Sequence, residues 1–279
     1  MKVLAIGASR NIGYHACKRL LESGATVTFL LRKPEVFDDD DEIKGFVATG
    51  HARLIKGNAM SKDDVAQAWK EAARGDDGAP VEYVLFSVGI SPSEGGISLT
   101  KGITFSTPNT VTQCLLNVFA TLPLDDPQPR VITISSNGLT HKSHSALPLA
   151  LKPIYGWMLQ MPHRDKCGAE EVTAHCAGWE WDPRDSPGAD ILGEKWEARL
   201  PGRGEVKGVV VVRPALLSNG ECMGDKGPRR CGKPPYRVKA EGDVSGAWTI
   251  SRKDVAHFMV EGIMKNWSEW EGKRVSIAY

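Results

Sequence analysis

The sequence predicts an α/β fold built around a doubly wound parallel sheet. Short apolar runs rich in β-branched residues alternate with segments of helical periodicity along most of the 279 residues. Several of these runs lack a polar alternate face, which is typical of central parallel strands covered by helices on both sides. A glycine-containing turn also joins the first run to the first helical segment. Together these observations favour repeated strand–helix units.

The strands are predicted at Val3–Ile6, Thr26–Leu31, Arg53–Ile55, Tyr83–Ser87, Val131–Ser135, Val209–Val212 and Val275–Ile277. The helices are predicted at Ile12–Ser23, Asp63–Arg74, Pro108–Thr121, Pro162–His175 and Lys253–Asn266. Capping boxes are indicated where a serine precedes an aspartate by three residues, as Ser61 does Asp64 and Ser251 does Asp254. Thr107 before Pro108 is also typical of a helix start.

Two long segments, 176–207 and 217–247, interrupt the alternation. The first holds Trp179, Trp181 and Trp196 among Pro, Gly and charged residues, and the second is rich in Gly, Pro, Lys and Arg. Long loops in compact domains are often functional. We expect both segments to form a small C-terminal region that covers a substrate pocket, within a single domain spanning residues 1–279. The acidic run Asp38–Glu42 is either a solvated loop or the start of a short helix.

The bulk composition excludes several classes of protein. A net charge of +1 gives no electrostatic reason to expect nucleic acid or an anionic membrane as a partner. The six cysteines contain no Cys-x-x-Cys pair and no zinc spacing. The first strand begins within two residues of the N-terminus, and the apolar runs are only of strand length, so we expect neither a signal peptide nor a membrane span. A cytoplasmic location follows as an expectation.

The turn between the first strand and the first helix has the pattern of a phosphate-binding loop. Gly7 permits a tight turn off the strand, and Gly13 permits close packing of the helix on the sheet. Asn11 stands where such loops usually have a second glycine, and asparagine tolerates a left-handed backbone better than most residues. A helix N-terminus at this place attracts a pyrophosphate. The first 32 residues therefore predict a Rossmann-type dinucleotide site.

The end of the second predicted strand indicates which dinucleotide binds. NAD-binding units usually have an Asp or Glu there, which bonds the ribose 2′-hydroxyl. This chain has Arg32 and Lys33 instead, and Arg10 lies in the loop itself. A guanidinium binds a 2′-phosphate bidentately, so the cations favour NADP(H). The alternative is that Arg32 and Lys33 are solvated surface cations. Neither Gly-Lys-Ser/Thr after the loop nor Gly-x-Ser-x-Gly is present.

Further motifs in the same order along the chain resemble the short-chain dehydrogenases/reductases, and in particular their atypical NmrA-like NAD(P)H-binding branch. They are the loop Gly7–Gly13, Gly57-Asn58-Ala59, Ser87-Val88-Gly89, the turn Ile134 to Gly138, Val210 to Pro214, and Ile250 to Ala256. The resemblance implies that the cofactor is held by Gly7, Ser9, Arg10, Asn11, Ile12, Asn58, Ala59, Ser87, Val88, Gly89, Ser135 and Lys166, in addition to Arg32 and Lys33.

The chain departs from that family at the catalytic pair. Family members use a Ser and Tyr-x-x-x-Lys, in which the lysine lowers the tyrosine pKa. Here Leu159 stands four places after Tyr155, so the pair is absent. Lys166 resembles the family's helix lysine, and His163 shares its helix face. In one interpretation Lys166 binds the nicotinamide ribose and Tyr155, Ser136 or His163 supplies a proton. In the other, Lys166 is structural and pairs with Asp165, Glu170 or a surface acid.

The leading hypothesis is an NADPH-dependent reductase that transfers hydride to a small aromatic or apolar carbonyl, enone or imine. The lost tyrosine–lysine pair keeps a second hypothesis open, an NADP(H)-binding redox sensor without turnover, and a cofactor-retaining isomerase or lyase is a third. We expect a monomer or homodimer with a small-molecule substrate and no metal. The basic residues Arg229, Arg230 and Lys233 are candidates for an anionic substrate group.

Overall fold

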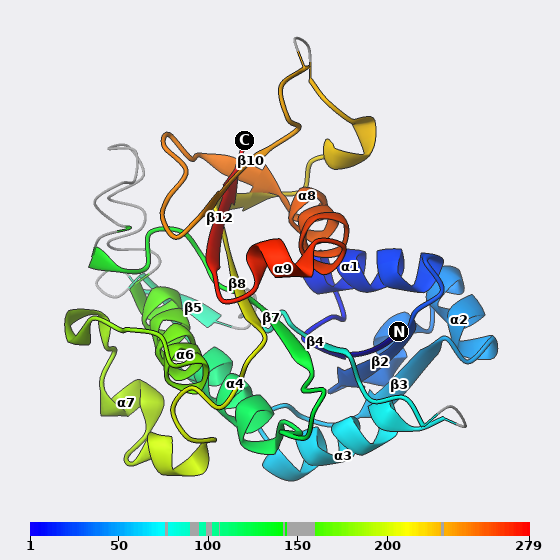
Figure 1. The fold of residues 1–279 in the computed structure, drawn as a ribbon, viewed down its shortest axis with the longest axis horizontal. Helices are drawn as coiled ribbons and strands as arrows, with labels where there is room; N and C mark the ends of the chain where they lie inside the picture. The colour runs from blue at the N-terminus through cyan, green and yellow to red at the C-terminus, as the bar shows by residue number, and fades with distance from the viewer. Residues whose placement is uncertain are drawn as a thin grey trace.

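A computed structural model of the protein describes residues 1–75, 78–89, 95–98, 102–105, 107–141, 143, 160–229 and 232–279. In these ranges the principal sheet has eight strands in the order β10-β12-β8-β7-β4-β1-β2-β3 (Figure 1). Their bounds are β1 Lys2–Ile6, β2 Thr26–Leu31, β3 Ala52–Lys56, β4 Tyr83–Phe86, β7 Arg130–Ile134, β8 Val209–Pro214, β10 Arg237–Ala240 and β12 Arg274–Ala278. Seven of these strands run parallel, and β10 pairs antiparallel with β12.

Burial on both faces explains why these segments form the sheet. All five residues of β1 and all six of β8 are buried, as expected for parallel strands covered by helices on both sides. The seven predicted strands are therefore confirmed, with bounds that differ by at most two residues. The strand order reverses between β1 and β4. In open α/β sheets such a reversal opens a crevice at the carboxyl ends of the strands, where ligands bind.

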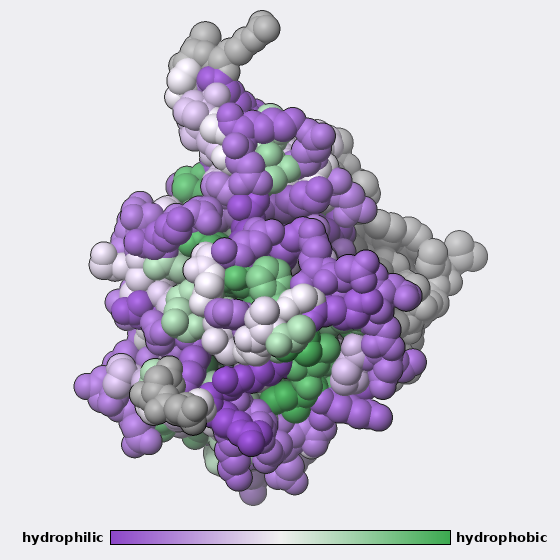
Figure 2. Space-filling view, turned by 90° about the vertical axis from the view of Figure 1, so that its right-hand side faces the viewer, coloured by the Kyte–Doolittle hydropathy of each residue, from purple (hydrophilic) through white to green (hydrophobic). Residues whose placement is uncertain are grey.

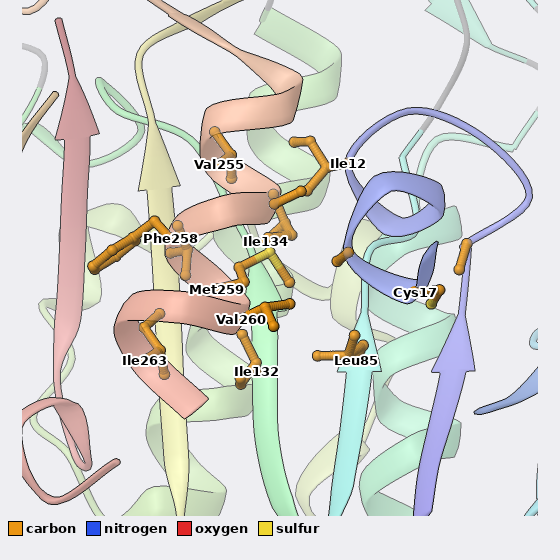
Figure 3. Close-up of a cluster of buried hydrophobic side chains, with 14 of the residues drawn as sticks. Ile12, Cys17, Leu85, Ile132, Ile134, Val255, Phe258, Met259, Val260 and Ile263 are labelled. Atoms are coloured by element: carbon orange, nitrogen blue, oxygen red, sulfur yellow. The ribbon is translucent and has the colours of Figure 1, made fainter. Parts of the chain in front are cut away.

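The helices form a layer on each face of the sheet. One hydrophobic cluster joins one face to α1 (Asn11–Glu22), α2 (Asp41–Ala48) and α8 (Arg252–His257). A second cluster joins the other face to α3 (Lys62–Ala73), α4 (Thr110–Thr121) and α6 (Gln160–Ala177). Figure 3 shows α1 and α8 side by side over the strands, with Ile12, Val255 and Met259 between them. The face that lies on the right of Figure 1, around α2, α3 and β3, is mostly hydrophilic (Figure 2).

Two predicted helices differ in detail from the structure. The segment predicted as one helix over Lys253–Asn266 begins as α8 and continues as a π-helix over Phe258–Met264. Gly262 faces the Phe258 ring there, and a Cβ on Gly262 would lie 2.5 Å from Phe258 Cδ2. The acidic run resolves to its second alternative: the Asp40 carboxylate accepts a hydrogen bond from Ile43 N and begins α2.

The helix starts at Ser61 and Ser251 are confirmed, because each serine hydroxyl accepts the N–H of the aspartate three residues later. The predicted start at Thr107 and Pro108 is wrong. The helix α4 begins at Thr110, and its N-cap residue makes no side-chain cap. The cap comes from α6 instead, because the Asp165 carboxylate accepts hydrogen bonds from Val111 N and Thr112 N, both at 2.8 Å.

The two long segments are more ordered than the sequence predicts. Segment 176–207 contains the short helix α7 (Ala189–Leu192), and Trp179 and Trp196 pack against the core. The guanidinium of Arg274 also lies 4.7 Å from the Trp179 ring centroid. Segment 217–247 supplies β10 and part of β9 (Leu216–Ser218), which pairs with β11 (Thr249–Ser251). The remaining small pair is β5 (Gly95–Ser98) with β6 (Gly102–Phe105).

The cap that Asp165 of α6 provides for the N-terminus of α4 leads to a stability prediction. Replacing Asp165 by alanine leaves two N–H groups without acceptors in a buried place, so we expect Asp165→Ala to lower the free energy of unfolding by about 3 kcal/mol. Asp190→Ala is the control, because Asp190 forms an exposed ion pair with Arg164 and its loss costs less than about 1 kcal/mol. Urea denaturation measures both, and equal losses in the two variants would contradict the role given to Asp165.

Candidate active site

The loop Gly7–Gly13 leaves β1 at the carboxyl edge of the sheet and enters α1. Gly7 has a φ of +80°, and a Cβ on it would lie 2.5 Å from Val88 N at the end of β4. A Cβ on Gly13 would lie 2.2 Å from Ser87 Oγ. Only glycine fits at either place. The backbone roles predicted for both glycines agree with this geometry, and it brings the ends of β1 and β4 into contact.

The N-terminus of α1 has the features of an anion site. Asn11 has a φ of 59°, in the left-handed region that the sequence predicts for this position. The N-cap residue Arg10 makes no side-chain cap, and the first turn contains no acidic residue. By contrast, α3 and α8 are capped by their own serines. The N–H groups of the first turn of α1 and the positive end of its dipole are therefore available to a phosphate.

Cations surround this N-terminus. Arg10 is exposed in the loop, and Arg32 and Lys33 are exposed directly after β2. The pKa of the Cys114 thiol on α4 is raised to about 12, chiefly by burial and also by Asp165, whereas the guanidinium of Arg32 acts in the opposite direction. No carboxylate occupies residues 32 and 33 after the strand.

The other residues predicted to hold a cofactor lie at the ends of β3 and β4. Asn58 N donates to Asp64 Oδ2 at 2.7 Å, and Ala59 O accepts from Asn117 Nδ2 at 3.0 Å. Ser87 Oγ donates to Gly7 O at 3.1 Å, so it fixes the loop. Val88 and Gly89 continue from β4. Of the remaining predicted contacts in the loop, Ser9 is half-buried, and the Ile12 side chain is buried in the core.

The helix α6 brings Lys166 to the end of β7. Lys166 Nζ donates a hydrogen bond to Ser135 O at 2.8 Å. Burial lowers the pKa of Lys166 to about 8, although Glu170 and Asp165 act in the opposite direction. The lysine therefore lies at the same edge of the sheet as the glycine loop, on the face that α4 and α6 cover.

A buried ion pair holds α6 against the sheet. Glu170 accepts hydrogen bonds from Arg213 of β8, with Arg213 Nε at 2.9 Å from Glu170 Oε1, and also from the Ser135 hydroxyl. Burial tends to raise the pKa of Glu170, but Arg213 and the hydroxyl hold it below its usual value. Ser135 thus contacts Glu170 with its hydroxyl and Lys166 with its carbonyl.

These contacts bear on the structural interpretation of Lys166, for which Asp165 and Glu170 are two of the predicted partners. Both are engaged elsewhere, Asp165 by the N-terminus of α4 and Glu170 by Arg213. The ion pairs found in the described part of the chain do not include Lys166. Pairing of Lys166 with Asp165 or Glu170 is therefore wrong, because each carboxylate is held by stronger or more numerous donors.

The other candidates for catalysis are placed less favourably. Ser136 Oγ is half-buried and donates to Asn137 O at 3.2 Å. His163 is half-buried on α6 and has an interaction partner. Tyr155 lies outside the described residues, as does Arg230. Arg229 stacks over the Tyr279 ring at 5.2 Å, and Lys233 is exposed.

Sequence reasoning missed the buried acids of α6. Asp165 and Glu170 are 0% and 3% exposed, on a helix whose periodicity gave no sign that acidic positions face inward. Small residues between them were the available signal. A Cβ on Gly168 would lie 2.6 Å from Thr112 Oγ1, which shows how closely α6 approaches α4. In the described ranges no cluster of His, Cys, Asp or Glu has the arrangement of a metal site.

Comparison with known proteins agrees with the fold. No model of a known protein family matches the chain. Over 153 residues, 54% of this chain, it is 34% identical to Reductase pytE of Aspergillus terreus, and the match spans about half (48%) of that reductase. Over 95% of this chain and 90% of the relative it is 23% identical to Oxidase pynE of Aspergillus niger.

Among solved structures, one similar fold is that of ChuY, an anaerobilin reductase from Escherichia coli O157:H7. The two superimpose with a TM-score of 0.57 at 16% identity, and the match covers all of this chain and 97% of the ChuY chain. Yeast methylglyoxal/isovaleraldehyde reductase Gre2, complexed with NADPH, superimposes with a TM-score of 0.57 at 15% identity. This match covers all of this chain and 78% of the Gre2 chain. These likenesses confirm the predicted Rossmann-type α/β fold. The NmrA-like branch stays a prediction. Among the helices of the described ranges, none has the length and apolar character to cross a membrane.

The ion pair between Glu170 and Arg213 gives a prediction about stability and pH. In Glu170→Gln the buried guanidinium loses its counter-ion, so we expect the free energy of unfolding at pH 7 to fall by about 3–5 kcal/mol. Because folding lowers the pKa of Glu170, the carboxylate stabilises the wild type above its ordinary pKa of 4.5 and loses that effect as the pH falls below it.

The difference in the free energy of unfolding between wild type and Glu170→Gln should therefore be smaller at pH 4 than at pH 7. Urea denaturation at both pH values measures it. Glu221→Gln removes an exposed carboxylate and is the control, expected to unfold like the wild type at pH 7. A difference between wild type and Glu170→Gln that is small at pH 7 would refute the structural role of the pair.

Proposed function

We propose that the protein is an NADP(H)-dependent oxidoreductase that acts as a reductase. The observation that supports this most directly is the N-terminus of α1, which is lined by glycines, has no side-chain cap and is flanked by the cations Arg10, Arg32 and Lys33. The named relatives, a reductase and an oxidase, and the reductases of similar fold support the same class of activity.

The residues at the carboxyl edge fit such a cofactor. The first-turn N–H groups of α1 would bind the pyrophosphate, and Gly7 would let the backbone approach it. Arg32 and Lys33, with Arg10, would bind the 2′-phosphate. Asn58 and Ala59 would contact the adenine side of the cofactor, and Ser87, Val88, Gly89 and Ser135 the nicotinamide side, where Lys166 would bind the ribose.

The bound nicotinamide would supply a hydride to a small aromatic or apolar carbonyl, enone or imine. The protein would orient the substrate at the carboxyl ends of β4 and β7, and a protein group would provide the proton.

A redox sensor without turnover is the second candidate. The residue one turn before Lys166 on α6 is Pro162 rather than a tyrosine, so the described part of α6 lacks the family's usual proton donor.

The choice between NADPH and NADH is tested by reversing one charge. In Arg32→Glu a carboxylate replaces the guanidinium and repels a 2′-phosphate. We expect the dissociation constant of NADPH to rise by about 100-fold. This corresponds to about 3 kcal/mol for the loss of a charge-assisted bidentate contact and its replacement by repulsion. The constant for NADH should change much less. Fluorescence titration measures both.

Lys207→Glu is the matched control, because Lys207 is exposed and lies just before the amino end of β8. Equal weakening of NADPH and NADH by Arg32→Glu would contradict selection of the 2′-phosphate. Consumption of NADPH with a panel of carbonyl, quinone and enone substrates tests the reductase itself. Binding without turnover across that panel would favour the sensor.

A further inference from the structure

The site contains two serine hydroxyls at the end of β7, and both are engaged. The Ser135 hydroxyl is buried and donates to the Glu170 carboxylate. The Ser136 hydroxyl donates to Asn137 O. Either would have to break a hydrogen bond to the protein before giving a proton to a substrate, and Ser135 would also lose a contact that helps to hold α6.

The helix α6 places the amine of Lys166 at the carboxyl edge of the sheet. The position one turn before Lys166 on α6 is Pro162, whose side chain has no ionisable proton. Lys166 Nζ has three donor positions when protonated. In the part of the chain that the structure describes, its only hydrogen bond is to Ser135 O at 2.8 Å. Two N–H groups of the ammonium therefore remain for a ligand at the end of β7.

The groups around the amine keep it from a permanent ion pair. The Asp165 carboxylate bonds Val111 N and Thr112 N of α4. The Glu170 carboxylate bonds Arg213 of β8 and the Ser135 hydroxyl. Asp165 and Glu170 are thus held by other partners, and they act on Lys166 only through their charges.

We propose that Lys166 is the proton donor of the reduction, in place of the absent tyrosine. This inference rests on the proposed reductase function. The hydride of NADPH forms the new C–H bond at the substrate carbon, and the electron pair of the C=O π bond moves to oxygen. That oxygen takes a proton from Lys166 Nζ. The products are the alcohol, NADP⁺ and a neutral amine, which solvent then protonates again.

The electrostatics of the site are compatible with this role. Burial lowers the pKa of Lys166 to about 8 against the opposing fields of Glu170 and Asp165. An acid with a pKa close to the working pH is efficient in proton transfer. The protonated form is present below this pH, so the rate should be constant at neutral pH and fall as the pH rises through about 8.

The decisive variant is Lys166→Arg, which keeps a cation and a donor for Ser135 O but gives up a proton far less readily. We expect kcat to fall by about 100-fold, in the range typical of a lost general acid. NADPH should still bind, because arginine keeps a cationic donor for the nicotinamide ribose. The fall in rate above pH 8 should disappear. Lys207→Arg is the matched control and should retain kcat and its pH dependence.

A second measurement does not depend on activity. Acetic anhydride labels only unprotonated amines, so labelling of the wild-type protein across a pH series, read by mass spectrometry, reports the titration of Lys166, with Lys207 as an exposed reference. We expect the Lys166 peptide to titrate near pH 8. Titration above about pH 10 would overturn the proposal even if Lys166→Arg failed to fold.

The outcomes separate the proposal from the function on which it rests. Retained kcat in Lys166→Arg would overturn the proton-donor role while leaving the reductase intact. A fall above pH 8 that persists in Lys166→Arg and disappears in Tyr155→Phe or His163→Gln would assign the proton to that residue instead. A wild type that binds NADPH but reduces no substrate would refute the proposed function, whatever the labelling shows.

Discussion

The position of α6 depends on two buried carboxylates with fixed partners. Asp165 reaches the N-terminus of α4, and Glu170 reaches Arg213 near the carboxyl end of β8. An unpaired carboxylate in either place would cost several kcal/mol, so a helix that slipped or rotated would lose both contacts at once. Lys166 lies between these two anchors, and its place at the end of β7 follows from them. The candidate site thus depends on charges that face the interior.

The N-termini of α1, α3, α4 and α8 differ in what accepts their first N–H groups. All of them begin with N–H groups that have no partner within the helix. In α3 and α8 a local serine accepts one of them, and in α4 the acceptor comes from another helix. Only α1 among these four begins without a side-chain cap, and it begins at the glycine loop. The difference separates helix ends that are completed by the protein from one that is suited to an external anion.

The covering segments are tied to the body by aromatic and charged contacts. Trp179 packs against the core beneath the Arg274 guanidinium. Tyr236 OH lies 2.7 Å from His257 Nδ1 of α8, and Asp225 pairs with Arg19 of α1. Trp179 and Trp196 therefore anchor their segment to the core.

The sequence by itself determined the strands, most of the helices and the glycine loop. Those features are local, because β-branched apolar runs, capping serines and the backbone freedom of Gly7 act within a few residues. It also indicated the cations after β2. It did not determine the start of α4, the burial of Asp165 and Glu170, or the addition of β10 to the sheet. Each of these depends on partners far away in the chain: Asp165 lies 53 residues from Thr112, and Glu170 lies 43 residues from Arg213. Only folding brings such groups together, since a buried charge finds its counter-charge in space and not in sequence.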